Sequence, residues 1–316
     1  MRKLALRDEI LLQIDKAARY IGGEVNAVMK NKDDVDIRFA MAFPDVYEIG
    51  MSNLGMMILY NMFNQREDVW CERLFSPWPD LDKVMREQNI PLFALESQEP
   101  IRDFDFLGIT IGYEMCYTNI LQVLDLSGIP LKSADRGEDF PIVIGGGACA
   151  YNPEPLAPFF DMFYIGEGET VYDALFDAYK ANKKAGGSRR DFLLAAAKIP
   201  GIYVPSLYEV TYKEDGTIAS FAPTADGVPE KVQKQLIIDM EKEYRAVEAP
   251  VVPHIKATQD RVTLEIQRGC IRGCRFCQAG MIYRPTRERD VETLKESARI
   301  MLKNTGHEEI SLSSLS

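Results

Sequence analysis

Several features are scarce in this sequence, and each absence argues against a class of protein. No apolar run reaches the ~18 residues that a membrane-spanning helix needs, so we expect no membrane segment. The first ten residues reach acidic side chains before a signal-type apolar stretch forms, which predicts a cytoplasmic protein. Lys and Arg (37) are outnumbered by Asp and Glu (48), and the net charge of -11 argues against a nucleic-acid surface spread over the whole molecule. It does not exclude a local basic patch.

Histidine and cysteine are also rare, with two and six residues among 316. Cys71, Cys116 and Cys149 lie far apart in apolar surroundings, so we expect buried thiols there rather than ligands or disulfides. Apolar side chains make up 46% of the chain and charged ones 27%. This composition suits a soluble globular protein with one large hydrophobic core or two ordinary ones.

The other three cysteines stand close together, at Cys270, Cys274 and Cys277, on a loop that Gly269 and Gly273 loosen. Thiolates at positions i, i+4 and i+7 can converge on one small inorganic core, whereas disulfides would leave an odd cysteine unpaired. Three ligands for a four-iron cluster leave one iron open, just as a three-ligand zinc site keeps a position for chemistry. The spacing therefore predicts an iron-sulfur site.

A structural zinc site is the alternative, because spaced cysteines are equally natural zinc ligands. It needs a fourth ligand, for which His254 and His307 are the candidates. His254 lies beyond a predicted strand and His307 beyond a predicted helix, and neither stands at a usual finger spacing. We favour the cluster, and a non-enzymatic binding module stapled by zinc stays as the alternative.

The pattern Cys-x3-Cys-x2-Cys, with Phe276 just before the third cysteine, resembles the signature of radical S-adenosylmethionine (SAM) enzymes. In that family the three thiolates hold a [4Fe-4S] cluster, and the amino and carboxylate groups of SAM chelate the fourth iron. The resemblance implies reductive cleavage of SAM to a 5'-deoxyadenosyl radical, with the electron supplied by a reductant such as flavodoxin or ferredoxin. It also implies that Phe276 and Arg284 lie on the SAM side of the site.

Three arginines follow the cysteine loop: Arg284, Arg287 and Arg289. The resemblance places the matching residues near the site, while a solvated or salt-bridged basic turn is the alternative. These arginines also give some support to a second function, methyl or methylthio transfer to RNA or protein. The sequence does not identify the substrate.

Apolar runs and helical patterns alternate between residues 35 and 185. The runs are short and nearly continuous, which suits strands covered on both faces. They lie at residues 35–43, 69–75, 106–112, 141–145 and 161–166. Helical patterns separate them, and the alternation predicts an α/β domain built on a doubly wound parallel sheet.

Two of these strands end in glycine-rich turns, one with Gly145, Gly146 and Gly147 and the other with Gly166 and Gly168. Such turns let a ligand approach the backbone closely, and ligands of open parallel sheets bind beyond the carboxyl ends of the strands. Neither turn fits the Gly-x-Gly-x-x-Gly dinucleotide pattern. A pair of tight turns that simply leave their strands explains the glycines equally well.

Residues 44–55, 144–148 and 165–169 resemble the N-terminal domain of a radical enzyme family with a cobalamin-binding-type fold. The Asp-x-His-x-x-Gly signature of that fold is absent, which excludes cobalamin ligated through a histidine. Cobalamin held without a histidine stays open, as does a domain that kept the fold and lost the cofactor. We favour the second.

The chain thus divides into four predicted parts. Residues 1–34 form a helical segment with an amphipathic helix over 8–21, and residues 35–185 form the cobalamin-binding-like domain. Residues 186–255 form a β-rich connector with a hairpin turn, and residues 256–316 begin a radical SAM (βα) barrel. Because a barrel needs several more βα pairs, we expect a fragment that alone cleaves SAM poorly.

Overall fold

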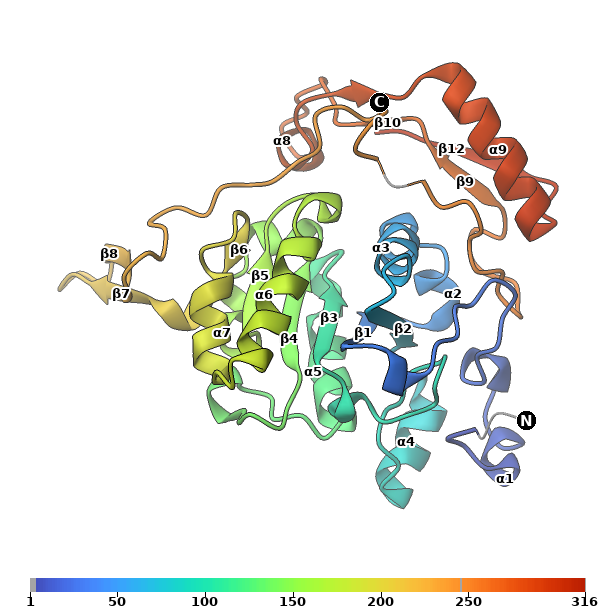
Figure 1. Ribbon diagram of the computed structural model, residues 1–316, viewed down its shortest axis with the longest axis horizontal. Helices are drawn as coiled ribbons and strands as arrows, with labels where there is room; N and C mark the ends of the chain where they lie inside the picture. Colours follow the sequence, from blue (N-terminus) through green and yellow to red (C-terminus); the bar gives the residue numbers. More distant parts are fainter. Residues whose placement is uncertain (1–3, 245, 316) are drawn as a thin grey trace.

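A six-stranded sheet forms the centre of the computed structural model, which describes residues 4–244 and 246–315. Its strands are β1 (Ile37–Phe43), β2 (Val69–Phe75), β3 (Phe106–Thr110), β4 (Ile142–Gly146), β5 (Met162–Tyr164) and β6 (Ile202–Tyr203). They lie in the order β2-β1-β3-β4-β5-β6, all parallel except β6 (Figure 1). This is the flavodoxin-like order with an antiparallel edge strand added, and it confirms the predicted doubly wound sheet.

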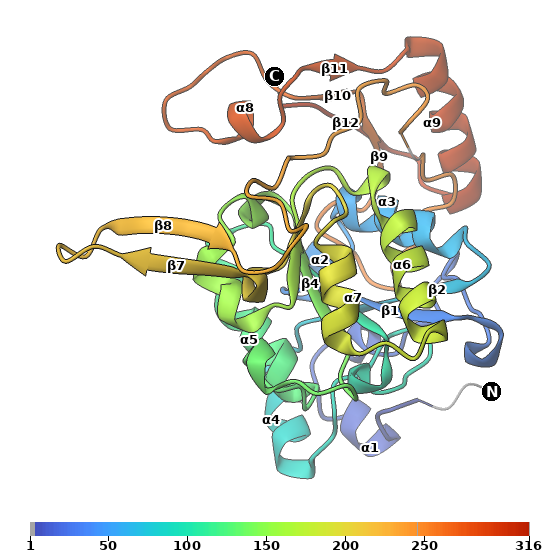
Figure 2. The same cartoon turned by 60° about the vertical axis from the view of Figure 1, so that its left-hand side comes forward.

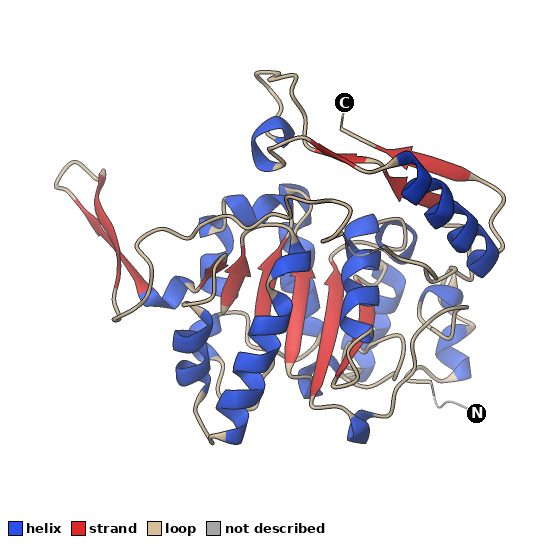
Figure 3. Cartoon of the chain, turned by 45° about the horizontal axis from the view of Figure 1, so that its top comes forward, coloured by secondary structure: helices blue, strands red, loops and turns tan. Residues whose placement is uncertain are grey.

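Helices cover both faces of the sheet, because its strands carry apolar side chains on both sides (Figure 3). One face is covered by α3 (Leu54–Asn64), α6 (Tyr172–Lys184) and α7 (Arg189–Ala196). The other is covered by α4 (Pro79–Gln88) and α5 (Tyr117–Leu126). The alternation of strands and covering helices is the one that the apolar runs predicted.

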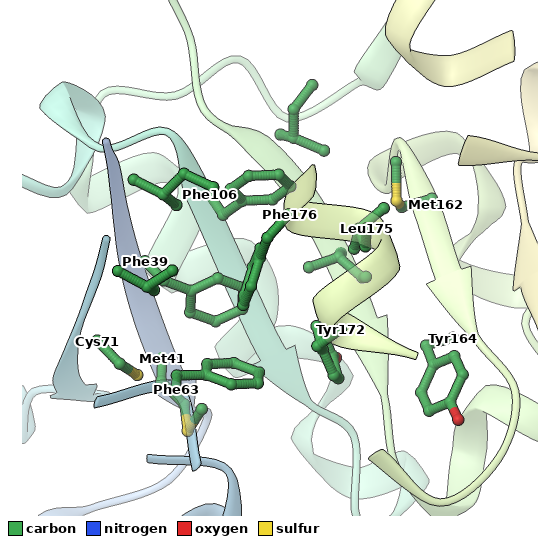
Figure 4. Packing of buried hydrophobic residues seen from close by; sticks show 14 of the residues in the cluster. Phe39, Met41, Phe63, Cys71, Phe106, Met162, Tyr164, Tyr172, Leu175 and Phe176 are labelled. Atoms are coloured by element: carbon green, nitrogen blue, oxygen red, sulfur yellow. The ribbon is translucent and has the colours of Figure 1, made fainter. Parts of the chain in front are cut away.

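Aromatic rings fill the space between the sheet and α3 and α6 (Figure 4). The ring of Phe39 lies 4.9 Å from that of Phe63 and 5.8 Å from that of Phe106, measured between centroids. Phe63 in turn lies 4.6 Å from Tyr172. Gly108 on β3 makes room for this stack, because a Cβ atom there would collide with the ring of Phe39.

The N-terminal segment is less helical than predicted. Only α1 (Asp8–Leu11) and a short 3-10 turn at Ala17–Arg19 form within the predicted helix over 8–21. The chain turns away at Lys16, which has a left-handed backbone, and the amide of Asp15 donates to the Asp80 carboxylate at 2.7 Å. Tertiary contacts thus replaced helix formation, although the apolar stripe still packs into the core.

The sheet also extends past the predicted boundary at residue 185. Helix α7 follows a capping box at Ser188, and β6 then returns to pair with β5. Residues 202–203, which the sequence assigned to the connector, are therefore an edge strand of the central sheet. The connector begins with a projecting hairpin, β7 (Tyr208–Tyr212) and β8 (Ile218–Pro223), as predicted (Figure 2).

A smaller α/β unit lies over the edge of the sheet where the parallel strands end (Figure 1). It contains β9 (Val262–Glu265), β10 (Gln267–Arg268), α8 (Ala279–Ile282), β11 (Arg287–Glu288), α9 (Val291–Thr305) and β12 (Ile310–Ser313). The remaining short helix, α2 (Tyr47–Gly50), follows β1 in the larger domain. Strands β9 and β12 pair in parallel, and α9 packs on β9. This is a βαβ unit, as the predicted start of a barrel requires. In the described part of the chain, no helix combines the length and apolar character that crossing a bilayer demands.

The aromatic core gives the first prediction. Replacing Phe106, which is fully buried, by alanine leaves a cavity beneath α6, and we expect the free energy of unfolding to fall by about 3–5 kcal/mol. Phe276 is 93% exposed, so its replacement by alanine is the matched control and leaves that free energy within about 0.5 kcal/mol of the parent value. Urea unfolding of both variants measures the difference. Equal midpoints would contradict the packing described here.

Candidate functional site

The three closely spaced cysteines lie on a loop between β10 and α8. Cys270 is half-buried, whereas Cys274 and Cys277 are exposed. Gly269 and Gly273 both have positive φ angles, of 90° and 64°, so the loop uses the left-handed backbone that glycine tolerates. All three thiols are free. As predicted, Cys71, Cys116 and Cys149 are also free and are buried.

The arrangement of the three thiols is not that of an assembled metal site. Among residues 4–244 and 246–315, no three His, Cys, Asp or Glu side chains are placed to hold a metal ion. The donor set nevertheless fits an iron-sulfur cluster chemically, because three accessible thiols share one loop and none is used in a disulfide. His254 lies elsewhere, with its ring nitrogen 3.2 Å from the carbonyl oxygen of Gly22.

The base of the cysteine loop is closed by two short antiparallel strands, β10 and β11. Arg268 lies directly opposite Arg287 in this pair, and both side chains are buried. Gly269 allows the two strands to approach, because a Cβ atom there would lie only 2.6 Å from the carbonyl oxygen of Pro285. The two ends of the segment that carries the cysteines therefore lie side by side.

Glu167, which follows β5 of the larger domain, binds both arginines. Its carboxylate accepts two hydrogen bonds from Arg287, at 2.7 and 2.8 Å, and one from Arg268 at 3.2 Å. Burial raises the pKa of Glu167, but the hydrogen bond from Arg287 and the charge of Arg268 outweigh burial and hold the pKa below its usual 4.5. Glu167 is therefore ionised at neutral pH.

Arg268 has two further carboxylate partners. It donates to Glu169 at 2.6 Å and to both carboxylate oxygens of Glu265, at 2.9 and 3.0 Å. Burial lowers the pKa of Arg268, but the hydrogen bond to Glu265 and the charges of Glu169 and Glu265 outweigh it and raise the pKa. The guanidinium also lies 5.4 Å from the ring centre of Tyr244.

The remaining arginines of the turn differ from one another. Arg289 is buried, with its guanidinium 4.3 Å from the ring centre of Tyr244, and Arg284 is exposed. Arg287 and Arg289 thus match the alternative interpretation of this turn, in which the arginines make contacts within the chain. Phe276, the other residue predicted on the SAM side, is exposed as well.

A cavity of about 500 Å³ lies between the larger sheet and the cysteine-bearing unit. It opens beyond the carboxyl ends of β1, β3, β4 and β5, where ligands of such sheets bind. Its volume falls within the range of small-molecule pockets, about 300–1,000 Å³. Apolar side chains of α3, Tyr164 and Tyr172 form one side, and Glu265, Gln267, Arg268 and Tyr283 form the other.

Four of the five predicted glycines line this cavity: Gly146, Gly147, Gly166 and Gly168. Gly145 does not line the cavity. It packs against the ring of Phe163, and a Cβ atom on Gly145 would lie only 2.7 Å from that ring. The glycine-rich turns are therefore placed where a ligand of the N-terminal domain would bind, with Gly145 serving packing instead.

Comparison with known proteins identifies the larger domain. Residues 55–205 match the family model described as "Radical SAM proteins, N-terminal". Over this region the chain is similar to the N-terminal part of radical SAM proteins. The match includes the glycine-rich turns from which the resemblance was drawn, and the cysteine loop lies outside the matched residues.

The similar proteins are distant in sequence. "Uncharacterized protein MJ0966" of Methanocaldococcus jannaschii is 26% identical over 256 residues, which cover 81% of this chain and 44% of the relative. The chain thus spans less than half of the length of this curated relative. Two structures of the radical SAM methyltransferase TsrM from Kitasatospora setae, one with tryptophan and a SAM analogue and one with cobalamin and a [4Fe-4S] cluster, are similar at TM-scores of 0.44 and 0.46. Their identities are 15% and 13%, and the similar regions cover 87% and 89% of this chain and 47% and 48% of theirs.

Cobalamin is the cofactor that the resemblance of the N-terminal domain to a cobalamin-binding-type fold implies, and ligands of such sheets bind at the edge where the cavity lies. The described residues of the cavity wall include no histidine, so none of them supplies the imidazole ligand of the usual cobalamin site.

Sequence reasoning did not single out Glu167, Glu169, Arg268 or Tyr244, although they contact one another at the base of the cysteine loop. The two glutamates stood in the glycine-rich turn that the resemblance used, but their partners lie about a hundred residues away in the sequence. The only available signal was charge, since acidic residues in a buried turn require basic partners.

The glycines of the cavity provide the second prediction. Gly166 has a φ of 146°, and a Cβ atom there would collide with the backbone of Gln235, so we expect Gly166→Ala to destabilise the chain by about 1–3 kcal/mol. Gly146 also lines the cavity, yet a Cβ atom there meets nothing within 4 Å, so Gly146→Ala is the control and unfolds as the parent does. Thermal unfolding compares the two. A Gly166→Ala chain as stable as the control would show that the backbone contact is not as described.

Proposed function

We propose that this chain provides the cluster-binding loop and N-terminal domain of a radical SAM enzyme. The observation that carries the proposal is the position of Cys270, Cys274 and Cys277. Their loop follows β9 at its carboxyl end, within the βαβ unit formed by β9, α9 and β12. Functional groups of parallel α/β barrels lie at this end of their strands. The family match of residues 55–205 supports the same conclusion.

In this proposal the three cysteine thiolates hold a [4Fe-4S] cluster, which supplies the single electron for reductive cleavage of SAM. The exposure of Cys274 and Cys277 leaves one side of the loop open to a small molecule and to an electron donor of the flavodoxin or ferredoxin type. Arg284 and Phe276, which are exposed on the same segment, are proposed contacts of SAM. The substrate lies outside what these residues specify.

Methyl or methylthio transfer to RNA receives no support from two of the three arginines after the loop, because only Arg284 is exposed. Arg287 and Arg289 are buried, and their guanidinium groups contact Glu167 and Tyr244. They offer no positive surface to a phosphate backbone, which needs accessible Lys and Arg side chains. The net charge of -11 points the same way.

Anaerobic reconstitution with iron and sulfide tests the proposal. We expect the parent chain to bind iron with acid-labile sulfide, and the variant with Cys270, Cys274 and Cys277 all replaced by alanine to bind neither above background. The control is Cys71→Ala, which removes a buried thiol of the larger domain and keeps the metal content of the parent. Retention of the cluster absorbance by the triple variant would refute the assignment. Stoichiometric zinc without sulfide in the parent would favour the zinc-stapled module instead.

A further inference from the structure

Two like charges face each other at the base of the cysteine loop. Arg268 and Arg287 are cross-strand neighbours in the β10–β11 pair, and their side chains are only 10% and 6% exposed. Like charges directly opposite each other destabilise a strand pair, and more so where water does not screen them. An acidic group that binds both guanidinium groups would offset this repulsion.

That group comes from the other domain. Glu167 is 9% exposed and binds Arg268 and Arg287 at once, with each of its carboxylate oxygens accepting from Arg287. Glu169, two residues on, binds Arg268 alone. Glu265 also binds Arg268, but it belongs to the same small unit and cannot fix that unit to the larger domain.

The backbone around Glu167 is held in place as well. The amide of Glu167 donates to Gln235 at 3.0 Å, and the amide of Gln235 donates to Ile165 at 3.0 Å. Two residues after Gln235, the amide of Ile237 donates a hydrogen bond to the Glu167 carboxylate at 3.0 Å. Lys234 donates to the carbonyl oxygens of Ile282 and Arg284, at 2.6 and 3.0 Å, just beyond the cysteines.

We propose that Glu167 is a positioning residue for the cysteine loop, binding the arginines at both of its ends so that the N-terminal domain sets where the three thiols lie. The positioning role rests on the proposed function in one respect, which is that the positioned loop is the one that binds the cluster. Glu167 and Arg268 also line the cavity, so a ligand of the N-terminal domain would contact the residues that hold the loop.

The metal-free full chain allows a direct test with Glu167→Gln, which keeps the shape of the side chain and removes its charge. We expect hydrogen exchange at residues 266–269 and 286–289 to accelerate by about tenfold or more, because charge-assisted hydrogen bonds to both arginines are lost. Cys270, which is half-buried, should react faster with a thiol reagent, while the exposed Cys274 and Cys277 change little.

Asp161→Asn is the matched control. Asp161 lies just before β5, whereas Glu167 lies just after it. The Asp161 side chain is 2% exposed and binds two arginines, Arg136 and Arg189, away from the cysteine loop. We expect this variant to lower the unfolding midpoint without changing exchange at the loop base or the reactivity of Cys270. Glu169→Gln, which loses one contact to Arg268 only, should accelerate exchange at residues 266–269 more than at 286–289.

Equal exchange at the loop base in the Glu167→Gln and Asp161→Asn variants would overturn the inference, since it would assign Glu167 to general stability. These measurements need no cluster, so they can succeed or fail whether or not the chain binds iron. If the parent binds zinc instead of a cluster, the proposed function falls and the positioning role of Glu167 is still decided by exchange and labelling.

Discussion

The contact between one carboxylate, Glu167, and two arginines, Arg268 and Arg287, holds the two parts of this chain together at the place where function is expected. Arg268 and Arg287 are buried and the Glu167 side chain is only 9% exposed, so the removal of Glu167 would leave Arg287 without its carboxylate partner in a region of low dielectric constant. A buried ion pair contributes little net stability against an apolar replacement, but it specifies one arrangement strongly. Here it specifies where the cysteine loop begins and ends.

This contact also explains how the fold brings a pocket and a loop together. The parallel strands end at one edge, the glycine-rich turns make that edge open, and the cysteine-bearing unit lies over it (Figure 1). The same residues, Glu167 and Arg268, belong to the wall of the cavity and to the base of the loop. In the proposed function, the N-terminal domain orients the cysteine loop beside this cavity.

How much of this could be predicted from the sequence depended on whether the relevant signal was local. The strands of the central sheet were predicted because short apolar runs are local patterns, and the cysteine loop was found because its three cysteines lie within eight residues. The helix over residues 8–21 failed, since contacts with distant residues such as Asp80 decided the backbone there. The role of Glu167 could not be predicted, because its partner Arg287 lies 120 residues along the chain.

A double-mutant cycle between Glu167→Gln and Arg287→Gln tests the central contact most directly. The free energy of opening at the loop base, measured by hydrogen exchange in both single variants and the double variant, gives the coupling between the two side chains. We predict a coupling of about 1.5–3 kcal/mol, the range of hydrogen bonds to charged groups. Effects that add within about 0.5 kcal/mol would show that the two residues act independently and would contradict the central contact.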